Sequence, residues 1–564
     1  MLNIDWFLLI GTLLFIAIYG IWKNQKHSSI KSYLKGDNKA RWWTVGFSVM
    51  ATQASAITFL STPGQAYSDG MGFVQFYFGL PFAMIIICLF FLPVYQKLNV
   101  YTAYEFLENR FDLKTRTLTA ILFLIQRGLA AGITIYAPAI ILSVALGWDL
   151  KLLVILIGIM VIFYTLIGGT SAVNITQKQQ MFIIIIGLMS AFWIALIKMP
   201  ENIDFSKALK LAGYNQKLQV LDFSFDPNSR YTFWSGITGG LFLALSYFGT
   251  DQSQVQRYLS GKSLKESQMG LIMNGFLKVP FQFFILMLGV VVFVFYQYKT
   301  PPIHFNSKNI IELKKSNYAK DFIQVEKEYK LTQDLKHKIL LNPLFYDDSK
   351  LKKNYLQLEL DNQKQREKVN KLILKNNKKA STNDKDYIFI TFIINHLPHG
   401  VIGLLLAVIF AAAMSSTASE LNALSATTLI DLYKRHTPNL SAGHYVNMAK
   451  LFTLLWGIIA IAFASFGNLF ENLIQLVNII GSIFYGTILG VFLVAIFLKK
   501  IKSNPVFYGA IISELIVISC YLINLYIMPL FGYLWLNVIG SVLTIVFAFL
   551  FQKIENNKKN LNVY

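Results

Sequence analysis

The sequence predicts an all-α polytopic membrane protein, and three observations lead to this fold class. Hydrophobic residues make up 55% of the 564-residue chain and charged residues only 14%, whereas soluble domains carry about 25% charged residues. The apolar residues gather in runs long enough to cross a bilayer as a helix, which takes about 20 residues. No strand-like alternation recurs, which argues against a membrane β-barrel.

Thirteen such runs follow one another along the chain, and they should pack as one integrated bundle. No basic residues precede the first run, so it is predicted to be a retained span rather than a cleaved signal peptide. The predicted spans cover residues 4–22, 43–67, 72–95, 117–146, 150–168, 180–198, 232–256, 268–297, 399–431, 448–467, 471–498, 506–529 and 533–552.

The basic residues predict how the chain is oriented. If the spans alternate, one side of the membrane receives the basic loops 23–41, 97–116, 257–265, 431–450 and 499–502 and the tail from Lys553. Because cytoplasmic loops carry the excess of Lys and Arg, the N-terminus should lie outside and the C-terminus in the cytoplasm. We expect a multi-pass plasma-membrane protein, in a bacterium the inner membrane. The net charge of +21 then needs no nucleic-acid partner.

One loop differs from the others. Residues 301–386 are hydrophilic and rich in Lys, Asn, Gln and Asp. They fall on the outer side, where long loops are exempt from the charge rule. The stretch YLQLELDNQKQREKVNKLILK has patchy helical periodicity, which favours a small helical insert over a disordered one.

Several classes of site find no support in the sequence. Cys88 and Cys520 lie in apolar runs and offer neither a disulfide framework nor metal-ligand spacing. The seven His residues form no ligand pair. No cluster of a nucleophile with a base is visible, so we expect neither an enzyme nor a cofactor.

Polar residues interrupt a predicted span at 410–434, FAAAMSSTASELNALSATTLIDLYK. Six polar side chains lie within about two turns there, namely Ser415, Ser416, Thr417, Ser419, Glu420 and Asn422. Burying one unpaired hydroxyl costs about 1–3 kcal/mol, so the cluster needs an explanation. Small residues and hydroxyls can serve helix packing. Alternatively, they bring oxygen ligands to a small hard cation.

Two further interruptions lie in the second and seventh spans. Thr52, Gln53, Ser55 and Thr58 break the second apolar run, and residues 249–252, GTDQ, break the seventh. These spans are five apart and would occupy matching places in two repeated halves. Broken helices at matching places point to an inverted-repeat transporter, in which unwound turns free carbonyls for cations.

At these residues the chain resembles the sodium/solute symporter family. Six stretches carry the resemblance in order: FSVMATQASAITF (47–59), PVYQKLNVYTAYEFLENRF (93–111), YTLIGGTSAV (164–173), DQSQVQRYL (251–259), FLKVP (276–280) and SATTLIDLYK (425–434). Within the family, TAYEFLENRF and IYAPAIIL are most similar to the branch that carries iodide, monocarboxylates and anionic vitamins.

The resemblance implies a leucine-transporter-like fold with two inverted five-helix repeats, in residues 43–198 and 232–498. One extra helix would precede them in 1–24, two would follow in 506–552, and 553–564 would be a cytoplasmic tail. It implies a sodium-coupled symporter that imports a small solute by alternating access, for this branch an organic anion such as a monocarboxylate or a vitamin. A sodium/sugar symporter of the glucose or sialic acid type and a transporter-like sensor are the alternatives. A monomer would suffice.

The resemblance also implies one sodium ion, the only metal expected. Its ligands would be the carbonyls of Ala51, Ala54 and Ala412 and the hydroxyls of Ser415 and Ser416. The sequence supports the second group independently, because residues 412, 415 and 416 are spaced i, i+3 and i+4 on one helix face.

Two positions depart from the family's pattern. Gln177, in NITQKQQ, stands where many members carry an Asp that assists a second sodium ion, while Ser419 remains as a further candidate ligand. Glu420 stands where a small residue is common. Its cost at mid-bilayer, about 2.5–3.5 kcal/mol, implies a partner or a cavity unless it is hydrated near the cytoplasm.

The resemblance places three side chains at the central solute site, namely Gln53, Thr58 and Tyr247. Tyr247 would be an inner gate, and ordinary helix packing is the alternative for each. Lys278 matches a position close to the solute in sugar carriers. It would either neutralise an anionic solute or form a structural ion pair with Asp251 or Glu420.

Overall fold

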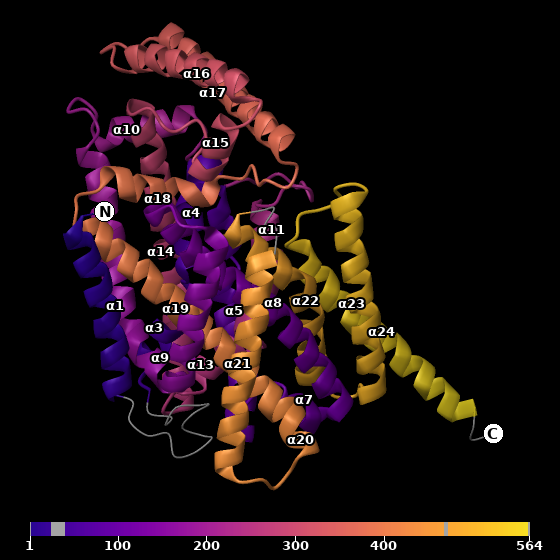
Figure 1. Ribbon diagram of the computed structural model, residues 1–564. Coiled ribbons are helices and arrows are strands. Elements are labelled where there is room, and N and C mark those ends of the chain that lie inside the picture. The colour runs from indigo at the N-terminus through magenta and orange to yellow at the C-terminus, as the bar shows by residue number, and fades with distance from the viewer. Residues whose placement is uncertain (1, 24–39, 467–471, 562–564) are drawn as a thin grey trace.

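The computed structural model describes residues 2–23, 40–466 and 472–561, and this part of the chain is helical apart from short connections (Figure 1). No strand forms in it; the one β-bridge among the described residues joins Ala40 to Gly261. The predicted all-α fold class is therefore confirmed.

Eight helical segments of the described chain are long and apolar enough to cross a membrane. They are Met71–Leu98, Leu113–Leu146, Leu264–Tyr298, Val401–His436, Ala442–Ser465, Leu473–Phe497, Ser503–Tyr526 and Trp535–Asn557. Two shorter apolar segments, Leu150–Leu166 and Met181–Ile197, add to them. The predicted spans 43–67 and 232–256 are each broken in the middle, and the total of thirteen stays a prediction.

The helices of the first half extend from α1 to the short helix α10. In order they are α1 (Asn3–Lys23), α3 (Trp42–Gln53), α4 (Ala56–Asp69), η1 (Met71–Tyr77), α5 (Leu80–Ile86), η2 (Ile87–Phe91), α6 (Leu92–Leu98), α7 (Glu105–Arg110), α8 (Leu113–Leu146), α9 (Leu150–Ile197) and α10 (Phe205–Tyr214). Asp112 and Asp149 begin α8 and α9 as N-caps, since their carboxylates accept from the first free N–H groups of those helices.

Both ends of α9 lie beside the hydrophilic insert. Asp149 pairs with Lys308 of the insert at 3.7 Å, and Lys198, at the other end, lines a groove together with His337 of the insert. The two apolar arms of α9 therefore cross the bundle in opposite directions. This agrees with the two separate spans predicted at 150–168 and 180–198.

The helices of the second half include the buried α19. They are α11 (Phe233–Ile237), α12 (Gly239–Gly249), α13 (Gln252–Tyr258), α14 (Leu264–Tyr298), α18 (Lys385–His396), α19 (Val401–Thr427), η3 (Thr428–Tyr433), α20 (Lys434–His436), α21 (Ala442–Phe466), α22 (Leu473–Phe497), α23 (Ser503–Tyr526) and α24 (Trp535–Leu561). α19 contacts α3, α4, α8, α9 and α21, and nearly all its residues are buried. Polar groups on α19 therefore face protein rather than lipid.

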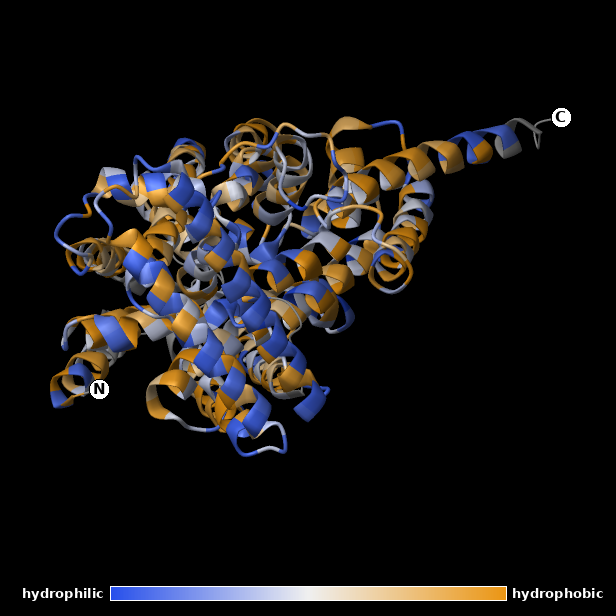
Figure 2. Ribbon diagram, turned by 90° about the horizontal axis from the view of Figure 1, so that it is seen from above, coloured by the Kyte–Doolittle hydropathy of each residue, from blue (hydrophilic) through white to orange (hydrophobic). Residues whose placement is uncertain are grey.

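The insert is a helical domain, as the periodicity predicted. It consists of α15 (Ser307–Lys314), α16 (Ala319–Leu340) and α17 (Ser349–Asn376). Phe322 and Tyr329 of α16 pack with Val369 of α17 in an apolar cluster separate from the main core. Figure 2 looks down on this side of the bundle, across which the largely hydrophilic α16 and α17 lie.

The two ends of the chain lie on opposite sides of the bundle (Figure 1). Near the start of α1, the Asp5 carboxylate lies 2.8 Å from Nδ1 of His399, which follows α18 on the insert side. α24 instead runs away from the insert and extends beyond the neighbouring helices at its C-terminal end. This relative arrangement is the one that an odd number of spans requires.

Candidate ion and solute site

The second predicted span is broken between α3 and α4. α3 ends at Gln53, Ala54 leaves the helical region with φ −83° and ψ 66°, and Ser55 is extended before α4 begins. Helix ends leave carbonyls without intrahelical partners. Within the residues described, no hydrogen bond at this break reaches the carbonyl oxygen of Ala51 or Ala54. Both oxygens are therefore available to a ligand.

α19 passes this break and contacts both α3 and α4. The Ser416 hydroxyl donates to the Ala412 carbonyl at 3.0 Å, which leaves its own lone pairs free to accept. The buried Ser415 hydroxyl has no hydrogen-bond partner in the described part of the chain. Oxygen atoms from the residues predicted to bind sodium thus lie on helices that touch one another.

The two residues predicted for a second ion are only partly visible. The Ser419 hydroxyl donates to the Ser415 carbonyl at 2.9 Å, one turn from the first group of oxygens. Gln177 lies outside the residues whose side chains the structure describes. Its part in a second ion site stays a prediction.

The seventh predicted span is broken between α12 and α13, but protein groups fill this break. Tyr95 Oη donates to the Gly249 carbonyl at 2.7 Å, and Tyr104 Oη donates to the Thr250 carbonyl at 3.0 Å. Asp251 caps α13 by accepting from the Ser253 N–H at 2.9 Å. The carbonyls here are occupied by hydroxyl donors.

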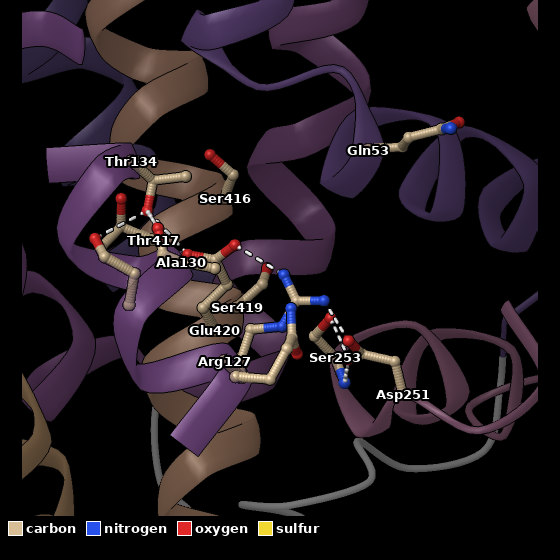
Figure 3. A network of polar contacts seen from close by, with 12 residues as sticks. Gln53, Arg127, Ala130, Thr134, Asp251, Ser253, Ser416, Thr417, Ser419 and Glu420 are labelled. Carbon is tan, nitrogen blue, oxygen red and sulfur yellow. Dashed lines mark hydrogen bonds and ion pairs between the residues drawn. The ribbon is translucent and has the colours of Figure 1, made fainter. Parts of the chain in front are cut away.

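Arg127 of α8 connects this second break to α19 (Figure 3). Its guanidinium pairs with the Asp251 carboxylate and donates to Glu420 Oε1 at 3.1 Å. It also donates to Tyr485 Oη of α22 at 2.6 Å, and that hydroxyl donates to Asp251 at 2.9 Å. Thr134 donates to the other Glu420 oxygen at 2.7 Å. These contacts hold α8, α19 and α22 together with the α12–α13 break.

This network forms the environment of Glu420. It also contains Arg127, a residue that the sequence did not lead us to single out. Glu420 is buried and fully paired, so the expectation of hydration near the cytoplasm is wrong. Arg127 was not singled out, although an Arg inside an apolar span is itself a signal for a buried partner or a functional site. Two carboxylates around one guanidinium leave the network with one net negative charge.

A cavity lined by both polar and apolar side chains lies between the first break and this network. Gln53, Thr58 and Tyr247, the residues predicted for the solute site, are among those that line it. It also contacts Thr52, Ser55, Phe76, Tyr77, Arg127, Thr134, Glu420, Asn478 and Tyr485. In Figure 3 the Gln53 side chain points away from the Arg127 network. Gln254 donates to Tyr247 Oη at 2.6 Å, which fixes that ring at the cavity wall.

Lys278 lies behind the cavity wall rather than in it. Its ammonium is fully buried and has no hydrogen-bond partner among the described residues. It sits 5.8 Å from the ring centre of Tyr77, a cavity-lining residue. The suggested ion pair with Asp251 or Glu420 is wrong, because both carboxylates pair with Arg127 from α8 instead.

Similar curated proteins are sodium-coupled transporters. The chain is 27% identical to the human sodium/iodide cotransporter over 85% of its own length and 63% of that protein. It is 28% identical to the Xenopus laevis sodium-coupled monocarboxylate transporter 1, over 89% of this chain and 68% of that one. It is 24% identical to the sodium/sialic acid symporter SiaT of Proteus mirabilis (strain HI4320), over 97% and 95%.

The lengths and the fold can also be compared. This chain spans less than two thirds of the human sodium/iodide cotransporter and 41% of the mouse sodium-coupled monocarboxylate transporter 2. Among solved structures, a substrate-bound outward-open Na+-coupled sialic acid symporter matches with a TM-score of 0.75 and 23% identity over 98% of both chains. The two chains share one fold, the predicted leucine-transporter-like one.

The model of the sodium:solute symporter family matches residues 33–321 and 371–513. The unmatched stretch between them covers most of α16 and α17, so the insert is an addition to the family's common core. With most of its length matched, the chain belongs to the sodium:solute symporter family.

Proposed function

We propose that this chain is a sodium-coupled symporter that imports a small solute by alternating access. One observation carries the proposal. The free carbonyls at the α3–α4 break lie on helices in contact with the hydroxyl-bearing α19, at the edge of the cavity described above. Carbonyl and hydroxyl oxygens are the ligands that a hard monovalent cation accepts.

The proposed sodium ligands are the five predicted oxygens, those of Ala51, Ala54, Ala412, Ser415 and Ser416. The free Ser415 hydroxyl supports this assignment most directly. The net negative charge of the Arg127 network, whose Glu420 lies one turn from Ser416 on α19, adds a favourable field for a cation. Ser419, and Gln177 in a lesser role, are the proposed positions for a second ion.

We assign the insert side and the N-terminus to the outside, and the C-terminus to the cytoplasm. The basic loops and tail support this orientation. The cavity then opens outward through the ends of α4, α18 and α22 and inward past Tyr247. Sodium would enter first from the insert side and favour the form open to that side.

For the solute, we propose an organic anion such as a monocarboxylate or a vitamin. The relatives that transport iodide and monocarboxylates support this class. Lys278 supports it too, since its ammonium lies unpaired behind Tyr77. An ammonium without a counter-ion in a buried place is costly, and a bound anion would relieve that cost.

A sugar-like solute of the glucose or sialic acid type is the second candidate. The amides and hydroxyls of Gln53, Thr58 and Asn478 at the cavity wall suit a solute with several hydroxyl groups. The full-length likeness to a sodium/sialic acid symporter supports it independently. Competition of radiolabelled uptake by lactate and pantothenate, against glucose and sialic acid, separates the two candidates.

The charge of the solute sets how strongly it can be accumulated. A potential of 100 mV contributes about 2.3 kcal/mol per charge, and a tenfold sodium gradient about 1.4 kcal/mol. A neutral solute carried with one sodium ion gains both and can reach about 500-fold accumulation. A monovalent anion carried with one sodium ion gains only the chemical part, about tenfold. Collapsing the potential with valinomycin therefore reads out the net charge moved.

The proposal is tested by uptake into proteoliposomes with external sodium or choline. We expect uptake only with sodium, and we expect Ser415→Ala/Ser416→Ala to abolish it. Thr417→Ala is the matched control, because the Thr417 hydroxyl donates to the Ala413 carbonyl on a neighbouring face of the same helix. Equal uptake in choline and in sodium would refute sodium coupling.

A further inference from the structure

Just outside the cavity, the outer ends of α4, α18 and α22 meet closely. α4 and α22 line the cavity with Ile57 and Ile474, and their contact with α18 lies on the insert side of these residues. A Cβ atom on Gly64 would lie 2.0 Å from the Lys385 carbonyl oxygen. The backbones of α4 and α18 therefore touch, and this contact closes the cavity from that side.

Polar side chains tie the three helix ends together. Gln65 of α4 donates to Asp69 at 2.5 Å, and Asp69 pairs with Lys385 of α18 at 2.7 Å. Asn472, the N-cap of α22, donates to Gln65 Oε1. Each helix is thus bonded to another at the same level, and opening the cavity to the insert side requires these contacts to break.

Asp386 lies buried among these helix ends. Its Oδ2 accepts from the Leu473 N–H, the first of α22, at 3.1 Å. Its Oδ1 has no hydrogen-bond partner in the described chain, and the buried Ser61 hydroxyl of α4 has none either. Ser61 is three residues before Gly64 and four before Gln65, so it shares the helix face that meets α18 and α22. Two unsatisfied oxygens therefore face one small buried place.

The charged and titratable groups around Asp386 do not neutralise it. The Lys385 ammonium is engaged with Asp69. Tyr136 of α8 and Tyr387 of α18 lie near it but supply no cation. Burial raises the pKa of Asp386 to about 6, while the Leu473 N–H acts in the lowering direction. The carboxyl is thus placed to change its protonation near neutral pH.

We propose that Asp386 is a proton-binding site that holds the outer ends of α4, α18 and α22 closed. The proton bonds to Asp386 Oδ1, so the buried carboxyl is neutral in the closed form and its O–H donates to Ser61 Oγ. When the three helix ends separate, the carboxyl becomes hydrated and releases the proton to external water. The inference rests on alternating access as proposed above, but not on sodium coupling or on the solute.

The sign of the pH effect follows from the raised pKa. Below a pH of about 6 the closed form holds a neutral carboxyl. As pH rises through this value, the closed form must bury a charge that the hydrated open form carries freely. With an open-form pKa near the ordinary value of about 3.9, the open fraction rises about tenfold between pH 5 and pH 7.5.

The test measures opening directly through the reactivity of a cysteine in the cavity wall. Val477→Cys places a thiol on α22 at the cavity, in a chain whose Cys88 and Cys520 are replaced by serine. Right-side-out vesicles are treated with an impermeant thiosulfonate between pH 5 and pH 7.5, without solute. The same chain with Asp386→Asn gives the reference rate at each pH, because thiol reactivity itself depends on pH.

We expect the labelling rate relative to D386N to rise about tenfold, with its midpoint near pH 6. Ser61→Ala removes the oxygen that accepts from the protonated carboxyl, so it should move that midpoint downward. Asp69→Asn breaks the neighbouring pair with Lys385 and should leave the midpoint in place. A flat ratio, or a midpoint that ignores S61A, overturns the proposal. The proposal is also overturned if, at constant pH, the labelling rate relative to D386N changes with the sodium concentration. Asp386 would then be an alkali-ion site.

Discussion

The two helix breaks occupy matching places in the two halves of the chain, yet they differ in what fills them. At the α3–α4 break, the carbonyls of Ala51 and Ala54 have no donor in the described structure. At the α12–α13 break, Tyr95 and Tyr104 donate to the freed carbonyls, and Asp251 caps the second half-helix. The first break is open to a cation, and the second is closed by the protein's own groups.

The difference teaches that an unwound helix is not by itself an ion site. Both breaks expose backbone at membrane depth, where an unsatisfied polar group costs several kcal/mol. At the second break, side chains satisfy the exposed backbone groups. The Arg127 contacts with Asp251 and Tyr485 also join α8, α13 and α22 there, and we call this contact the joint. At the first break, no group in the described part of the protein satisfies the carbonyls of Ala51 and Ala54, so a bound ion would take that place. The geometry of the first break then depends on whether the ion is bound. Coupling between ion and conformation needs that dependence.

The largest effect should follow from breaking the joint at the second break. Arg127→Met leaves Asp251 and Glu420 buried without their cation. Removing one partner of a buried ion pair costs about 3–5 kcal/mol. We expect R127M to lose most of its folded yield and thermal stability in detergent. The triple variant R127M/D251N/E420Q removes the charges together and should regain stability but not transport. An R127M protein as stable as the native one would contradict the role of the joint.

The next-largest effect concerns the sodium ligands at the first break. It should change the stabilisation by sodium but not the stability measured without sodium. The native protein should be stabilised by sodium, by about 2.7 kcal/mol at 100 times the dissociation constant. Ser415→Ala/Ser416→Ala removes two proposed ligands, so this sodium-dependent shift should disappear. The melting temperature in choline should change little, since the Ser415 hydroxyl makes no hydrogen bond in the described chain and the Ser416 hydroxyl only bonds back to its own helix. If Y104F at the second break abolished the sodium shift instead, the assignment of the two breaks would be reversed.

A smaller effect should separate the ion from the solute. Lys278→Met replaces an unpaired buried ammonium with an apolar chain of similar length. We expect the apparent KM for an anionic solute to rise at least about tenfold, which corresponds to about 1.4 kcal/mol. The sodium-dependent thermal shift should stay, because Lys278 is not one of the proposed sodium ligands. Stability without solute should rise or stay constant. A K278M protein with unchanged KM would argue against an anionic solute.

Much of this arrangement was predictable from one sequence, and the reason lies in the apolar background. Thr52, Ser55 and the stretch 249–252 stand out because polar residues in a 20-residue apolar run are costly. Both positions are breaks in the structure. The helical insert was visible for a similar reason, through its periodicity.

What the sequence could not predict is which polar groups meet. Lys278 and Arg127 are both single cations in apolar runs, and nothing in their spacing says which one faces Asp251 and Glu420. That depends on the rotation of α8 and α14 about their axes, which packing decides. The donors Tyr95, in α6, and Tyr104, just before α7, are distant from this break in sequence, so the closure of the second break was equally invisible. Asp386 and Ser61 are far apart in sequence for the same reason.

The smallest expected effect tests the closure of the second break without touching a charge. Tyr104→Phe removes the hydroxyl that donates to the Thr250 carbonyl at 3.0 Å, and a single hydrogen bond contributes about 1 kcal/mol. We expect a melting temperature lower by a few degrees and a sodium-dependent shift equal to the native one. Freeing this carbonyl makes the second break more like the first, but Tyr95 still donates to the Gly249 carbonyl and Asp251 still pairs with Arg127. If Y104F instead gained a second sodium-dependent shift, an open carbonyl would be sufficient for ion binding. The hydroxyls of α19 would then lose their place as the feature that distinguishes the two breaks.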